Sequence, residues 1–65
     1  MTPARKAALQ WFHDRGEVRE VWSENDAPSD VMVRMMLADE TLRWTARNGY
    51  FLTDKGRRAL HGDAA

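Results

Sequence analysis

The chain has 65 residues, ten basic and ten acidic side chains, and no cysteine. This length allows a single domain, and the absence of cysteine excludes disulfides, zinc–thiolate sites and thiol nucleophiles. No run of about 18 apolar residues is present, so we expect no membrane span. The N-terminus also lacks the apolar stretch of a signal peptide, which predicts a cytoplasmic protein.

The charges are distributed unevenly although they sum to zero. Residues 14–40 carry three basic and eight acidic side chains, whereas residues 41–62 carry five basic side chains and one acidic side chain. Such an asymmetry bears on the partners of a protein rather than on its fold.

The first quarter of the chain predicts a helix over residues 3–15. Thr2 can cap it, Pro3 suits its first position, and apolar residues recur at spacings of three and four. Gly16 can end it with a positive φ. Residues 17–22 contain β-branched side chains and predict a short strand, and the polar residues 23–28 predict a loop.

The rest of the chain predicts a helix, a hairpin and a closing helix. Ser29 or Asp30 can cap a helix over residues 29–39. Residues 42–46 alternate between apolar and polar side chains, which predicts a strand. Residues 47–49 (Arg-Asn-Gly) favour a tight turn, and residues 50–52 are expected to form the second strand. Thr53 or Asp54 then caps a helix that runs to Leu60. The predicted fold is therefore α+β, in the order helix, strand, helix, hairpin, helix, with one domain over residues 1–62 and a frayed tail at 63–65.

This order resembles the small winged helix-turn-helix domains of bacteria and phages. In that family the second wing strand commonly runs into an L-T-x-x-G-x-x-x-L turn and helix, and Leu52, Thr53, Gly56 and Leu60 match this pattern. The resemblance implies a DNA-binding protein of the kind that acts in transcription regulation. The family usually places two helices between the first strand and the wing, and it inserts the second of them into the major groove. Here residues 23–40 leave room for one helix, so the resemblance implies a shortened helix-turn-helix.

The basic residues of the last third are the candidate DNA contacts, because guanidinium and ammonium groups bind phosphates. The hairpin tip can also reach a minor groove. The alternative is a solvated surface without a ligand. The candidate DNA-binding residues, including one on the second predicted helix, are Arg34, Arg43, Arg47, Asn48, Lys55, Arg57 and Arg58.

Aromatic and methionine side chains are expected mainly in the core. Their positions within helix and strand patterns favour packing over base stacking for Trp11, Phe12, Trp22, Trp44, Tyr50 and Phe51. Met32, Met35 and Met36 fill irregular core space in the simplest interpretation. The helix over 29–39 nevertheless has more apolar positions than one buried face needs. It is therefore an alternative surface for a homodimer or a protein partner.

No group of residues indicates an enzyme, a metal site or a cofactor. His13 and His61 are far apart in the sequence and lack a neighbouring ligand at metal-binding spacing. The acidic residues lack the spacing of a calcium loop, and Asp54-Lys55-Gly56 lacks the glycine pattern of a phosphate loop. Two functional hypotheses follow, namely a DNA-binding protein with a basic wing, and a protein-interaction adaptor on the same fold.

Overall fold

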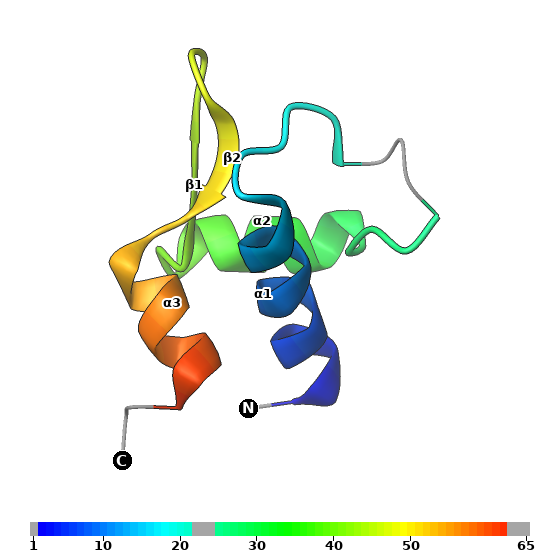
Figure 1. Cartoon of the computed structure of the whole chain (residues 1–65). Helices are drawn as coiled ribbons and strands as arrows, with labels where there is room; N and C mark the ends of the chain where they lie inside the picture. The colour runs from blue at the N-terminus through cyan, green and yellow to red at the C-terminus, as the bar shows by residue number, and fades with distance from the viewer. Residues whose placement is uncertain (1, 22–24, 63–65) are drawn as a thin grey trace.

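The computed structural model describes residues 2–21 and 25–62. It contains the helices α1 (Pro3–Arg15), α2 (Asp30–Ala38) and α3 (Asp54–His61), and an antiparallel hairpin of β1 (Leu42–Thr45) and β2 (Gly49–Leu52) (Figure 1). The α+β class is confirmed, in the order helix, helix, hairpin, helix. Within the described residues, no helix is long and apolar enough to cross a membrane.

Helix α1 begins and ends at the predicted residues. The Thr2 hydroxyl accepts a hydrogen bond from the Arg5 N–H at 3.2 Å, and Pro3 occupies the first helical position. Gly16 has a φ of +76°, and its N–H donates to the Phe12 carbonyl at 2.9 Å. These contacts satisfy backbone groups that a helix end leaves without partners.

The predicted strand over residues 17–22 is wrong for the described part of that segment. Only Val18 pairs, through two hydrogen bonds of 2.9 and 2.8 Å with the Tyr50 backbone. Val18 and Val21 are both buried, and a spacing of three cannot place two side chains on one face of a strand. The chain therefore bends away after a single bridge. Trp22 lies outside the described residues, as does the tail 63–65.

Helix α2 is capped by Ser29, whose hydroxyl accepts a hydrogen bond from the Met32 N–H at 3.2 Å. The helix ends one residue earlier than predicted, because the chain turns through Asp39 and then Glu40, which has a φ of +68°. The Asp39 carboxylate accepts hydrogen bonds from the backbone N–H and the hydroxyl of Thr41. This corner leads the chain from α2 directly into β1.

The hairpin has a three-residue loop, 46–48, between the paired residues Thr45 and Gly49. Gly49 has a φ of +78°, as the predicted turn requires. A Cβ at this position would lie 2.5 Å from the Val18 carbonyl oxygen. The glycine thus permits both the turn and the close approach of the neighbouring segment.

The L-T-x-x-G-x-x-x-L residues each have a structural role at the base of the hairpin. Leu52 and Leu60 are buried in the core, and the Thr53 hydroxyl accepts a hydrogen bond from the Gly56 N–H and so caps α3. Gly56 packs so closely on Thr41 that a Cβ would lie 2.2 Å from the Thr41 carbonyl oxygen. The motif therefore sets how α3 leaves the hairpin.

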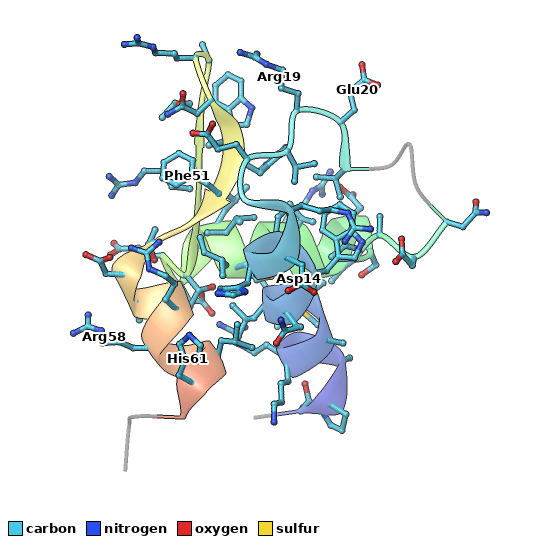
Figure 2. The ribbon with its side chains drawn as sticks, viewed as in Figure 1. Asp14, Arg19, Glu20, Phe51, Arg58 and His61 are labelled. Carbon is cyan, nitrogen blue, oxygen red and sulfur yellow. The ribbon has the colours of Figure 1, made fainter. Side chains whose placement is uncertain are left out.

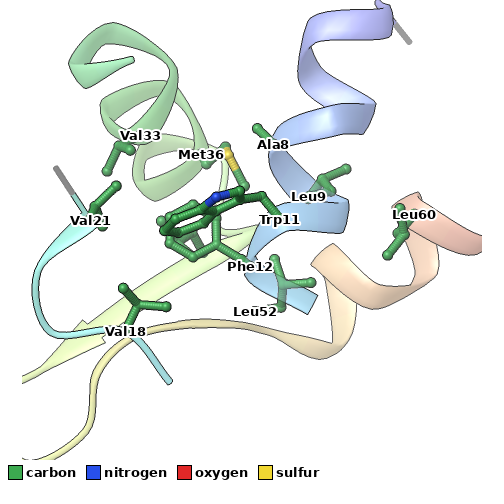
Figure 3. Packing of buried hydrophobic residues seen from close by; sticks show 11 residues of the cluster. Ala8, Leu9, Trp11, Phe12, Val18, Val21, Val33, Met36, Leu52 and Leu60 are labelled. Atoms are coloured by element: carbon green, nitrogen blue, oxygen red, sulfur yellow. The ribbon is translucent and has the colours of Figure 1, made fainter. Parts of the chain in front are cut away.

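The core gathers around one face of α1, where Leu9 and Phe12 are completely buried (Figure 3). Every other element and the segment after α1 contribute side chains to it, namely Val18, Val21, Val33, Met36, Leu42, Leu52 and Leu60. Trp11 is also buried, and its indole N–H donates to the Asp26 carboxylate at 3.2 Å. The Arg15 guanidinium lies 4.1 Å from the centre of the Trp11 ring. These contacts fasten the loop before α2 to α1.

The aromatic residues only partly follow the expectation of a core role. Trp11 and Phe12 are buried, whereas Tyr50 and Phe51 are half-buried. Trp44 is 53% exposed, so its expected burial is wrong. The hairpin extends beyond the helices that cover its base (Figure 1), and Trp44 lies on this protruding part.

Candidate nucleic-acid interface

The hairpin and α3 lie on the same side of the molecule, and together they carry six of the seven candidate DNA-binding residues (Figure 1). Arg43 and Phe51 are directly opposite each other in the hairpin register. With Lys55 and Arg57 of α3 they line one open groove. Asn48 lines the adjoining groove, which shares Phe51 and Arg57. The fold thus places cations from two elements around one aromatic ring.

The α3 cations differ in what they contact. The Lys55 ammonium donates to the Asp39 carbonyl at 2.7 Å. The Arg57 guanidinium contacts the Asp54 carboxylate and the Leu52 carbonyl. Arg58 points outward from α3 (Figure 2) and makes no hydrogen bond or ion pair with another described side chain. Arg58 is therefore the α3 cation that a ligand can engage without breaking an existing contact.

A cation outside the set predicted from the sequence lies at the tip of the hairpin. The Arg19 guanidinium donates to the carbonyls of Ala46 and Arg47 in the hairpin loop, the first at 3.3 Å, and it lies beside the tip in Figure 2. Arg47 itself is exposed, and its guanidinium has no partner among the described residues. Two arginines thus meet at the tip. Arg19 was missed because it lies in the predicted strand, and the sequence gives no sign of its distance to the loop.

Arg34 lies apart from this group. It is on α2, where its guanidinium pairs with the Asp30 carboxylate at 3.2 Å, one helical turn away. Neither of the grooves around Phe51 includes it. The structure therefore brings together the candidates of the hairpin and α3, and leaves Arg34 on another surface.

Acidic side chains limit the positive potential of this surface. Glu40 and Asp54 line the same groove as Arg43 and Lys55, and Glu17 lines the adjoining one. Of the three, Asp54 is paired with Arg57. The unopposed positive charge therefore concentrates on Arg43 and Arg47 along the hairpin and on Arg58 at the end of α3.

Helix α2 presents a second, different surface. Val31 is 66% exposed and Met35 is 50% exposed, and residues spaced by four lie on the same face of a helix. Met36 is buried and Met32 is half-buried, as expected for core filling. The methionine cluster is thus divided between the core and an exposed apolar strip.

Comparisons with protein-family models, with curated proteins and with solved structures gave no match for this chain.

Proposed function

We propose that the chain is a small winged-helix-like protein that binds the backbone of double-stranded DNA through its hairpin and α3. The observation that carries this proposal is that three guanidinium groups make no hydrogen bond or ion pair within the described chain. Those of Arg43, Arg47 and Arg58 have no partner among the described residues, and all three belong to the hairpin and α3. Phosphate contacts supply most of the sequence-independent affinity for DNA, and cations without internal partners are available to make them.

Two aromatic side chains that are at least partly exposed accompany these cations. Phe51 lines the same groove as Arg43, Lys55 and Arg57, and half-exposed Trp44 precedes the hairpin loop. Aromatic rings pack against sugars and bases where a cation holds the adjacent phosphate. Such a combination suits the backbone and minor groove better than major-groove readout, because the only helix between residue 18 and the hairpin in the described chain carries one cation, the paired Arg34.

The number of free cations predicts how strongly salt weakens binding. Three phosphate contacts give a slope of about −2.7 in a plot of log K against log salt concentration. Fluorescence anisotropy of a labelled mixed-sequence duplex, titrated at several potassium chloride concentrations, measures this slope. Binding that is absent at low salt, or that does not change with salt, contradicts the proposal.

Single variants locate the contact surface. Arg47→Ala and Arg58→Ala should each weaken binding and make the slope shallower by about 0.9. Lys6→Ala is the matched control, because Lys6 is an exposed cation on α1. Its removal changes the net charge equally, and we expect it to leave the slope unchanged. An equal effect of all three variants would indicate attraction by the net charge instead of a defined surface.

The exposed strip on α2 favours a second candidate, a protein-interaction adaptor. Val31 and Met35 are large apolar side chains that are exposed on α2, outside the hairpin and α3. Sedimentation analysis over a range of concentrations discriminates between the candidates. An adaptor that self-associates through α2 should become monomeric in the variant Val31→Ser, whereas DNA binding by a monomer is unaffected by this substitution.

A further inference from the structure

The two histidines of the chain are neighbours in space, contrary to the expectation from the sequence. His13 is in the last turn of α1 and His61 is the last residue of α3. Their ring centres are 5.7 Å apart and the ring planes are perpendicular. Both side chains are exposed, so their rings can turn without losing core contacts. Both imidazole groups of this protein therefore lie at one place, where the His13 side chain of α1 and the His61 side chain of α3 meet.

The separation of the rings fits two ligands of one metal ion. Zinc binds imidazole nitrogen at about 2.0–2.1 Å, which puts the ion about 3.2 Å from the centre of each ring. Two such rings have centres about 5.2 Å apart at the tetrahedral angle and about 6.4 Å apart when they face each other across the ion. The observed 5.7 Å lies between these limits.

The surroundings of His13 suit a metal ligand. The Asp14 carboxylate lies 3.5 Å from His13 Nδ1 and is itself held by the Gln10 amide at 2.7 Å. A carboxylate beside one ring nitrogen orients the ring and leaves the other nitrogen as the metal ligand. Both histidines also lie at the C-terminal ends of helices, where the helix dipole attracts a cation.

We propose that His13 and His61 bind a divalent late transition-metal ion such as Zn²⁺ or Ni²⁺. Imidazole nitrogen is a preferred ligand for these ions, whereas Mg²⁺ prefers oxygen. In the described part of the chain no set of three candidate ligands is present, so water completes the coordination. The bound ion links α1 to α3 through these two side chains. The site adjoins the proposed DNA surface, because His61 lines the same groove as Arg57 and Arg58.

Titration of the full chain with zinc chloride tests the site. The imidazole NMR signals of both histidines should shift together and saturate at the same zinc concentration. The melting temperature should rise by about 5 °C or more when zinc exceeds its dissociation constant tenfold. Magnesium chloride at the same concentration should change neither quantity.

The variants His13→Asn and His61→Asn give the decisive comparison. Each removes one ligand from an exposed position, so each should melt near the wild-type temperature without zinc and bind zinc at least tenfold more weakly. Loss of zinc stabilisation in both variants supports the shared site. Wild-type zinc affinity in either variant, or saturation of the two imidazoles at different zinc concentrations, overturns it.

Discussion

The base and the tip of the hairpin are held by different means. At the base, Leu42 and Leu52 are paired and buried, and the Thr41 carbonyl accepts a hydrogen bond from Thr53 and packs against Gly56. The tip is joined to the rest of the molecule by the Val18–Tyr50 bridge and by hydrogen bonds from Arg19. Substitutions at the base should therefore change stability most, whereas substitutions of side chains in the loop 46–48 should mainly change what the hairpin can bind.

The largest effect is expected at Gly56. The variant Gly56→Ala places a Cβ against the Thr41 carbonyl oxygen, which belongs to the backbone and cannot rotate away. Overpacking of this kind costs about 3 kcal/mol, which is most of the stability of so small a core. Thermal or urea unfolding followed by circular dichroism should show a much lower transition midpoint and a measurable unfolded fraction at room temperature. A wild-type transition would show that the base is less tightly packed than the structure indicates.

A smaller loss is expected for Gly49→Ala at the start of β2. The new side chain meets an unfavourable positive φ and also the Val18 carbonyl, for a total cost of about 2 kcal/mol. Gly16→Ala is the matched control. Gly16 has nearly the same φ, but a Cβ there meets no atom within 4 Å. The difference between the two unfolding free energies measures how firmly the Val18 segment is held against the hairpin. Equal values would mean that this segment can move aside.

The variant Thr53→Ala tests the link between the hairpin and α3. The Thr53 hydroxyl caps α3 at Gly56 and donates to the Glu40 carbonyl. Its loss should lower the unfolding free energy by about 1 kcal/mol. Thr53→Ser, which keeps the hydroxyl, should retain most of the stability in the same denaturant titration. Similar losses in both variants would assign the effect to the methyl group rather than to the cap.

The smallest stability effect is expected at Arg19. Its hydrogen bonds to the loop carbonyls are exposed, so Arg19→Ala should cost about 0.5 kcal/mol. Hydrogen exchange at the amides of residues 46–48 should nevertheless become faster, because the loop carbonyls lose their hydrogen bonds from Arg19. Arg47→Ala should change neither quantity, since its guanidinium has no partner among the residues that the structure describes. Unchanged exchange in Arg19→Ala would mean that the turn itself fixes the tip.

Local signals in the sequence were sufficient for most of the fold. The caps at Thr2, Ser29 and Thr53 and the turn at Gly49 all depend on residues close in sequence, and the structure has each of them. The strand over 17–22 was predicted wrongly because β-branched residues favour extended structure, whereas the need to bury both Val18 and Val21 bends the chain. That requirement comes from tertiary packing.

The candidate site was less predictable, because the partners of a charge are set by the fold. Lys55, Arg57 and Arg58 are neighbours in sequence. Within residues 2–21 and 25–62, the first two form hydrogen bonds through their side chains and the third does not. Arg19 joins the tip from a distant segment. Trp44 was expected in the core because strand alternation does not reveal where the covering helices end. The charge pattern of the sequence thus identified the basic third of the chain. It did not reveal which of these cations are free to bind a ligand.

The directions of α1 and α3 have a practical consequence. The start of α1 and the end of α3 lie at the same end of the molecule, opposite the hairpin tip (Figure 1). A tether attached at either end therefore leaves the tip unobstructed on an immobilised surface. Two copies joined in tandem by a flexible linker can also present both tips outward. Such a fusion would convert a weak single contact into bivalent binding with a high effective concentration for the second contact.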